Sequence, residues 1–196
     1  MGHSQQHKAK NHDRIVAIAA SQFRAHGLDG LSVAKLMAAA GLTHGGFYSH
    51  FATRDVLVEE AIDRAFEDAE HRLFSQLAGK RSDPLDVFLD VYLTPRHRDH
   101  PSDGCVLPAL STDIQRSASS ARAVYTKRLK EYFRRLAALC DRPQDAMAIL
   151  STAVGAMLLA RTVGDQALSK EILDNARAFL DERREARRRP RSRAPR

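Results

Sequence analysis

Apolar residues recur at helical spacing through almost the whole chain, and this constrains the fold more than any other feature. Near the N-terminus, Ile15, Ile18, Ala19 and Phe23 are three, four and eight positions apart, which places them on one face of an α-helix. No segment shows the alternation of apolar and polar residues that is typical of a half-buried strand. The pattern therefore predicts an all-α protein of about nine helices.

Caps and helix breakers set the expected ends of these helices. Gly27 is expected to end the first helix, because glycine readily adopts the left-handed conformation found there. Ser32 and Thr43 precede apolar runs and are candidate N-caps, and Pro84 stands where proline often opens a helix. Residues 95–103 are rich in proline and charge and are predicted to form a loop. The later helices are expected over 33–40, 43–51, 54–77, 84–93, 105–116, 119–139, 143–161 and 169–184.

The stretch 32–51 is the most informative part of this pattern, and it reads SVAKLMAAAGLTHGGFYSHF. It predicts two short helices joined by a tight turn at Gly41. The second helix contains Gly45 and Gly46, each of which costs roughly 1 kcal/mol relative to alanine inside a helix. Residues that break local rules without a packing benefit often mark functional surfaces. Here the missing side chains would let the helix lie close to base edges, so we predict a helix-turn-helix that enters the DNA major groove.

Positive charge is concentrated at the two ends of the chain. The net charge is +7; residues 1–52 hold five Lys and Arg against two acids, and residues 181–196 hold eight Arg against three acids. Basic ends favour contact with a polyanion, although for the C-terminal end simple solubility is an equally good interpretation. Residues 1–11 are expected to form a flexible basic arm and residues 185–196 a disordered Arg-rich tail.

Several classes of protein are excluded by what the sequence lacks. It has no HExxH, GxSxG, GxxxxGK[ST] or GxGxxG motif, so we expect no enzyme and no cofactor. Cys105 and Cys140 do not form a disulfide framework, and the spacing of His97, His100 and Cys105 matches no zinc site, so no metal is expected. No apolar run approaches the roughly 18 residues of a membrane span. We therefore expect a cytoplasmic protein without a membrane partner.

Residues 12–58 combine several local elements: the AAAGL turn, a small-residue pair before Phe47–Tyr48, then His50–Phe51, and Arg54 followed by an acid and Leu57. With these elements the stretch resembles the TetR family of transcriptional regulators. The resemblance implies a three-helix DNA-binding head over 12–53 and a helical ligand-binding and dimerisation domain over 54–184. It also implies a homodimeric repressor that binds a palindromic double-stranded operator and is released by a small hydrophobic effector.

The resemblance also suggests roles for individual residues of the motif. Thr43 and His44, at the start of the second helix, are the best placed to contact bases. Tyr48 and His50 match family positions that hold phosphates. Many members carry Lys or Arg at or just after the position of His44, so its base preference stays open. The predicted DNA-binding residues are Ser32, Lys35, Thr43, His44, Gly45, Tyr48, His50 and Arg54.

For the larger domain, the resemblance implies a ligand pocket and a four-helix dimer interface. The alternatives are a filled core and packing within one subunit, because periodicity does not separate a lined cavity from a packed interior. The pocket candidates are Phe66, Phe88, Tyr92, Cys105, Leu107, Leu110, Tyr125 and Leu129. The interface candidates are Leu150, Val154, Leu158, Ile172, Ala176 and Phe179.

Two other functions stay open at the level of sequence. Cys105 is expected at the start of a helix, where the helix dipole lowers the pKa of a thiol. The chain is therefore alternatively a repressor that senses oxidants or electrophiles through Cys105. The second alternative is a protein that coats nucleic acid without sequence preference through its basic ends.

Overall fold

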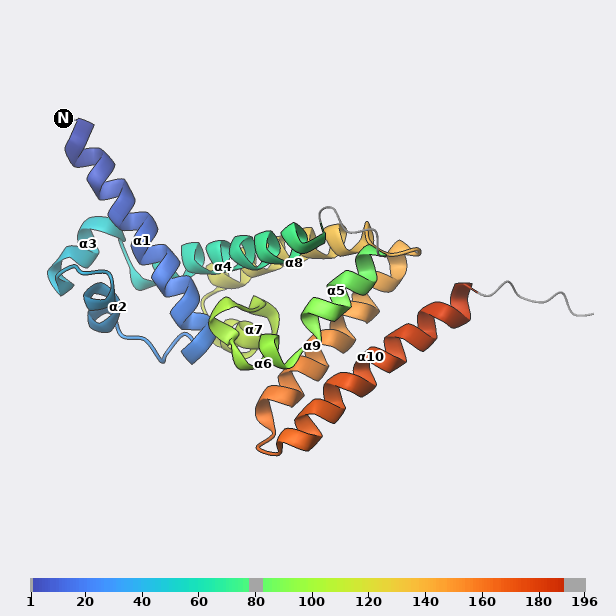
Figure 1. Cartoon of the computed structure of the whole chain (residues 1–196). Helices are drawn as coiled ribbons and strands as arrows, with labels where there is room; N and C mark the ends of the chain where they lie inside the picture. The colour runs from blue at the N-terminus through green and yellow to red at the C-terminus, as the bar shows by residue number, and fades with distance from the viewer. Residues whose placement is uncertain (1, 78–82, 189–196) are drawn as a thin grey trace, which may run out of the picture.

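The computed structural model describes residues 2–77 and 83–188, and within these ranges the protein is all-α (Figure 1). The fold class predicted from the sequence is confirmed, and the one α-helix beyond the nine expected is the short α6. Three 3-10 helices also occur in the described part: η1 (His44–Gly46), η2 (Pro101–Asp103) and η3 (Pro143–Asp145). The α-helices are α1 (Gly2–His26), α2 (Val33–Ala39), α3 (Phe47–His50), α4 (Arg54–Leu77), α5 (Pro84–Tyr92), α6 (Pro95–Asp99), α7 (Val106–Arg116), α8 (Ser119–Ala137), α9 (Ala146–Thr162) and α10 (Gln166–Arg188).

Local side-chain caps explain why several helices begin and end where they do. The Ser32 hydroxyl accepts a hydrogen bond from the backbone N–H of Lys35 at 3.3 Å, which caps α2 as predicted. Gly27 ends α1 with φ of +76°, a conformation that favours glycine. A Cβ atom there would also lie 2.8 Å from the Asp113 carboxylate. Glycine at this position therefore serves both the chain reversal and the close approach of α7.

Residues 95–103 are helical rather than the loop expected from their composition. α6 and η2 occupy this stretch, and each begins with a proline. Proline is well suited to a first helical position because the missing N–H would have no partner there in any case. The Thr94 hydroxyl also caps α6 by accepting from the His97 backbone N–H at 3.1 Å. Pro95 and Pro101 thus start short helices instead of preventing them.

The two expected terminal segments also differ from the prediction where the structure describes them. Residues 2–11, expected as a flexible arm, continue α1 back to Gly2. The segment holds no proline, and extending an existing helix fixes one residue per added hydrogen bond, which is much easier than starting one. At the other end, residues 185–188 belong to α10. Residues 189–196 of the expected tail lie outside the described residues.

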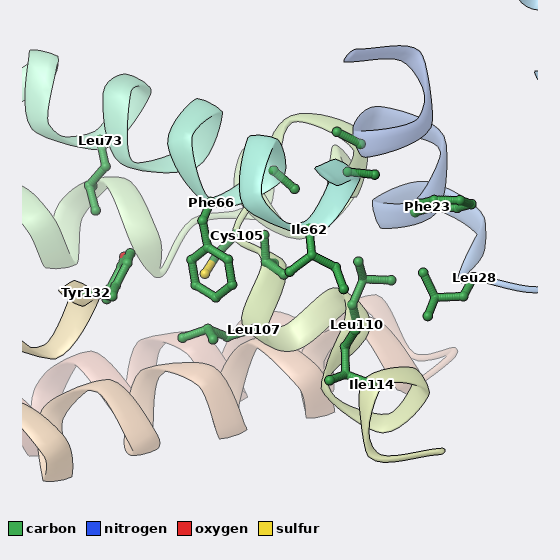
Figure 2. Close-up of a cluster of buried hydrophobic side chains, with 14 of the residues drawn as sticks. Phe23, Leu28, Ile62, Phe66, Leu73, Cys105, Leu107, Leu110, Ile114 and Tyr132 are labelled. Carbon is green, nitrogen blue, oxygen red and sulfur yellow. The ribbon is translucent and has the colours of Figure 1, made fainter. Parts of the chain in front are cut away.

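One hydrophobic core runs from the N-terminal helices into the rest of the molecule. α1 packs along α4 and also contacts η2 and α7. Figure 2 shows Ile62 and Phe66 of α4 facing Leu107 and Leu110 of α7, with Phe23 of α1 at the end of the same cluster. The helix-turn-helix is therefore mounted on the body through shared packing rather than through a linker.

α9 and α10 form an antiparallel pair at the side of the body away from α2 and α3 (Figure 1). Residues 143–162 are the one described stretch long and apolar enough, by length and composition, to cross a membrane. Leu150, Ala153 and Met157 of this stretch are fully buried in the protein core. Since 39% of its most apolar window is buried, packing against the rest of the chain accounts for part of its apolar character.

Candidate nucleic-acid interface and internal cavity

Two buried phenylalanines fix α3 on the head, which comprises α1, α2, η1 and α3. Phe47 and Phe51 are only 1% and 2% exposed, and their ring centroids lie 5.4 Å apart. Because they are four residues apart on one helical face, the intervening residues point elsewhere. Tyr48 is 72% exposed, the most exposed of the large apolar side chains in the described chain. An exposed tyrosine held on a buried anchor is typical of a binding surface.

The two glycines before α3 differ in what surrounds the position that a Cβ atom would take. No atom lies within 4 Å of the position that a Cβ on Gly45 would take. A Cβ on Gly46 would instead lie in ordinary contact with Met37 and Thr43, at 3.6 and 3.7 Å. Neither glycine is required by crowding inside the protein, and neither has a positive φ. The bare backbone at Gly45 is therefore free for the close approach of another molecule.

The other predicted DNA-binding residues divide into exposed and structurally engaged groups. The Arg54 guanidinium donates to the Leu28 carbonyl and lies 3.8 Å from Asp29. The Ser32 hydroxyl caps α2. Both side chains therefore already stabilise the head, whatever else they contact. The exposed members of the set are Lys35, Thr43, His44, Gly45 and Tyr48, together with Ser32, which is exposed although its hydroxyl caps α2.

His50 lies at the edge of this surface beside His12 of α1. Its Nδ1 atom is buried without a hydrogen-bond partner among the described residues. Burial lowers the pKa of His50, and the charges of His12 and Lys8 lower it further. His12 in turn contacts Glu60 of α4, with 2.5 Å between Nε2 and Oε2. This histidine pair was not evident from the sequence, because the two residues are 38 positions apart.

The N-terminal part of α1 adds basic side chains that the sequence had assigned to an arm. In Figure 1 this end of α1 projects beyond the head, past α3. Lys8, Lys10 and Arg14 are exposed on it. Their charge is visible in the sequence, but their rigid placement near α3 follows only from the continuation of α1 to Gly2.

A cavity of about 380 Å³ lies between α4, α5, the α6–η2 segment and α8. Of the predicted pocket residues, Tyr92 and Cys105 line it. Phe66, Phe88, Leu107 and Leu110 are instead buried in the packed core. These four do not line this cavity, and the sequence could not separate them from Tyr92 and Cys105 because a packed helical face and a cavity-lining face have the same periodicity.

The two remaining pocket candidates, Tyr125 and Leu129, also do not line the cavity. They are partly buried and pack against the core. The Tyr125 hydroxyl is hydrogen-bonded to Ser111 Oγ at 2.7 Å. Its polar atom is therefore already satisfied within the body of the protein.

His97 joins the two sides of the cavity wall. Its Nδ1 lies 2.8 Å from the Tyr92 carbonyl, and its Nε2 accepts from the backbone N–H of Cys105 at 3.0 Å. These partners require a neutral ring that carries its proton on Nδ1. Burial lowers the pKa of His97 to about 4, which keeps the ring neutral at physiological pH. The Arg161 guanidinium donates to the His97 carbonyl at 2.7 Å and fixes the same segment to α9.

The environment of Cys105 does not favour a reactive thiol. The residue precedes α7 as the sequence predicts, but it is only 5% exposed. Burial raises the pKa of the Cys105 thiol, and this outweighs the lowering effects of Arg161 and Arg24. Because the thiolate is the nucleophile, the geometry fits a cavity-lining residue better than an oxidant sensor.

A buried arginine connects the head to the cavity wall. Arg24 of α1 donates from Nε to the Ser102 carbonyl at 2.7 Å and from NH1 to the Ala65 carbonyl at 3.2 Å. Burial and the charge of Arg72 lower the pKa of Arg24 to about 10, so its guanidinium stays charged at neutral pH. Ser102 directly precedes the Asp103–Cys105 segment that lines the cavity. Any movement of that segment therefore acts on α1.

The outer face of α9 and α10 carries exposed apolar side chains. Leu158 and Phe179 are 43% and 46% exposed, and the other interface candidates Val154, Ile172 and Ala176 are partly exposed. Leu150 departs from the prediction, since it is 1% exposed within a single chain. α9 is apolar on most of its circumference, so its sequence pattern did not separate the inner side from the outer side.

Comparisons with known proteins agree with this geometry. Residues 15–61 match the family model described as bacterial regulatory proteins, tetR family. The chain is 27% identical over 85 residues to the HTH-type transcriptional repressor KstR2 of Mycolicibacterium smegmatis. That similarity covers 43% of this chain and 41% of the relative, so the chain matches about two fifths of that protein's length.

Solved structures match over nearly the whole chain. A TetR transcriptional regulator from Chloroflexus aurantiacus has a TM-score of 0.72 at 25% identity, covering 90% of this chain and 97% of that one. E. coli NemR in its reduced form has a TM-score of 0.73 at 19% identity, covering 88% and 96%. These similarities extend from the helix-turn-helix through the helical body. By the motif in residues 15–61 and by its overall fold, the chain is similar to the TetR family of transcriptional regulators.

Proposed function

We propose that the protein is a cytoplasmic homodimeric repressor that binds a palindromic operator through residues 12–53 and is released by an effector held within residues 54–184. The observation that carries the DNA-binding part is the exposed surface of Tyr48 and Gly45 held on the buried Phe47 and Phe51. Surface of this kind has no use in the packing of the monomer. It fits a helix that inserts into the major groove.

The residues of this surface suit different parts of the DNA. Thr43 and His44 lie at the start of η1, where side chains reach base edges first. Tyr48 and His50 offer hydrogen-bonding tips for phosphate oxygens. Lys35 and the basic side chains of the α1 extension supply charge for the DNA backbone, which strengthens binding to every sequence.

Dimerisation through the outer face of α9 and α10 would pair two heads. The exposed Leu158 and Phe179 are the apolar side chains that a second copy would cover. A two-fold related pair of heads binds two half-sites about 34–36 Å apart or a multiple of that spacing. A palindromic operator follows from that symmetry.

Release by an effector would use the contact between the cavity and α1. A ligand in the cavity presses on the Asp103–Cys105 wall, and Arg24 holds the neighbouring Ser102 carbonyl. A shift of this segment tilts α1 and changes the separation of the two heads. Operator affinity then falls, because both heads no longer fit their half-sites together.

The test is a selection of bound duplexes from random DNA at physiological salt. The full-length protein should enrich a palindrome, and Tyr48→Ala should bind that palindrome about 5- to 30-fold more weakly, as expected for the loss of a contact worth about 1–2 kcal/mol. Lys130→Ala, an exposed change on α8 outside the head, serves as the control and should bind normally. Salt-sensitive binding without an enriched sequence, equal in both variants, would contradict the proposal.

A further inference from the structure

We propose that the effector is a small organic anion with a flat apolar body, whose acidic group lies beside Arg96 at the mouth of the cavity and whose body carries an acceptor for the Tyr92 hydroxyl. This inference rests on the proposed function, since it names the chemistry of the ligand that the cavity takes. Three features of the cavity carry it: a buried hydroxyl, the charges at the mouth, and the apolar lining.

The Tyr92 hydroxyl is the clearest sign of a missing partner. Tyr92 is 2% exposed, and its hydroxyl has no nitrogen or oxygen partner among the described residues. Its neighbour Cys105 offers only a sulfur atom, which is a weak acceptor. Leaving a buried hydroxyl unsatisfied costs about 1–3 kcal/mol. Because Tyr92 lines the cavity, a ligand oxygen would recover this energy.

The ring of Tyr92 is held in place, which makes the hydroxyl a fixed donor. It stacks on Phe88 with 5.3 Å between ring centroids. Its other side meets the edge of the neutral His97 ring, at 4.6 Å. A donor fixed in advance loses little conformational freedom when a ligand binds.

Among the described residues at the mouth of the cavity, one arginine has no acidic partner. Asp103 lies 3.7 Å from Arg72, and Asp90 is paired with Arg177 of α10. Both acids that line the cavity therefore already face a guanidinium. Arg96 is exposed at the mouth and has no carboxylate within ion-pair distance in the described ranges. A carboxylate on the ligand is the complement of that guanidinium.

The two arginines that lie behind the cavity wall add further positive charge. Arg161 is mostly buried, donates to the carbonyls of His97 and Arg98, and its NH1 lacks a partner among the described residues. Arg24 lies on the head side of the same segment. Cations in a medium of low dielectric constant act over longer distances than cations in water. The interior of the cavity therefore favours electron-rich groups.

The remaining lining sets the size and shape of the ligand body. Leu73, Val91 and Tyr132 contribute apolar surface, and Figure 2 shows Leu73 and Tyr132 on facing elements, α4 and α8. A volume of about 380 Å³ is at the low end for small-molecule sites. A body of one or two fused rings suits these dimensions better than a long flexible chain.

The experiment uses 6-hydroxy-2-naphthoate and 6-hydroxy-2-naphthamide as probes, which share their ring system and the hydroxyl oxygen that can accept from Tyr92 but differ in charge. Titration calorimetry on the full-length protein should give at least tenfold tighter binding for 6-hydroxy-2-naphthoate. Arg96→Gln should remove most of this preference, whereas Arg122→Gln, an exposed change on α8, should preserve it. Tyr92→Phe should weaken both probes several-fold while leaving the thermal midpoint of unfolding unchanged or higher, because it removes an unsatisfied hydroxyl.

A parallel titration of operator-bound protein separates this inference from the proposed function. Equal binding of the two probes, or a charge preference that survives in Arg96→Gln, overturns the anion assignment. If 6-hydroxy-2-naphthamide releases the operator and 6-hydroxy-2-naphthoate does not, the effector function stands and its ligand chemistry is wrong. If neither probe binds while the operator is still bound, both the anion assignment and the cavity as effector site fail, and only the DNA-binding function remains.

Discussion

His97 shows how burial can fix the protonation state of a side chain and through it the shape of a site. Its two ring nitrogens hold the Tyr92 carbonyl and the Cys105 backbone N–H together across the cavity wall. Protonation of Nε2 would replace an accepted hydrogen bond with a repulsion between two N–H groups. The wall is therefore built for the neutral ring.

We predict that this arrangement makes folding stability fall in mild acid. The pKa of His97 is about 4 in the folded protein and 6.5 in the absence of structure. Between these values the unfolded chain binds a proton that the folded chain does not. The contribution of His97 to the free energy of unfolding is therefore complete above pH 6.5 and is lost as the pH falls towards 4. Urea unfolding at pH 7.5 and pH 5 should differ by about 2 kcal/mol more in wild type than in His97→Gln.

The matched control for this measurement is His26→Gln, because His26 is exposed at the end of α1. That variant should keep the pH dependence of the wild-type protein. A His97→Gln variant that loses as much stability on acidification as wild type would show that other groups carry the effect.

At the scale of elements, the segment η1–α3 keeps a glycine where packing does not require one. The Cβ position of Gly45 is open, whereas that of Gly46 faces Met37. Substitution of glycine by alanine in a compatible conformation stabilises a protein by about 0.4–1 kcal/mol, chiefly through the unfolded state. The two positions therefore form a matched pair that differs in the direction of the added methyl group.

We expect Gly45→Ala and Gly46→Ala to raise the thermal midpoint of unfolding by similar small amounts. Only Gly45→Ala should lower operator affinity, by about tenfold, because its methyl group points away from the protein into the space that DNA would occupy. Fluorescence anisotropy with labelled operator measures both affinities. Unchanged affinity in Gly45→Ala would mean that the backbone at this position does not approach the DNA.

The same elements show what could be predicted from the sequence. The capping of α2 by Ser32 and the end of α1 at Gly27 depend on neighbouring residues, so local chemistry was enough to predict them. The cavity depends on how distant helices fit together, and Phe66 has the same periodicity whether it lines a space or fills one. The prediction of a loop over residues 95–103 was wrong, because a proline-rich composition typical of loops also suits the first turns of short helices.

At the scale of the whole molecule, the outer face of α9 and α10 decides the assembly. We predict that Phe179→Glu yields a monomer in sedimentation equilibrium at micromolar concentration, since it places a charge on an exposed apolar face. Operator affinity should fall at least a hundredfold, because a single head binds only one half-site. Ala123→Glu adds the same charge to an exposed position on α8 and should stay wild type in both measurements. If the Phe179→Glu variant is still a dimer, another face of the protein must form the dimer interface.

The uninterrupted core between head and body has a consequence for anyone who wants to exchange DNA specificities between regulators of this kind. A chimera joined near residue 53 would cut between Phe23 and its neighbours on α4 and α7, and would separate Arg24 from the Ser102 carbonyl. Mismatched halves would then meet across a surface that was never an interface. Grafting residues 43–50 alone leaves that surface intact, so the smallest transplant is also the one most compatible with the host.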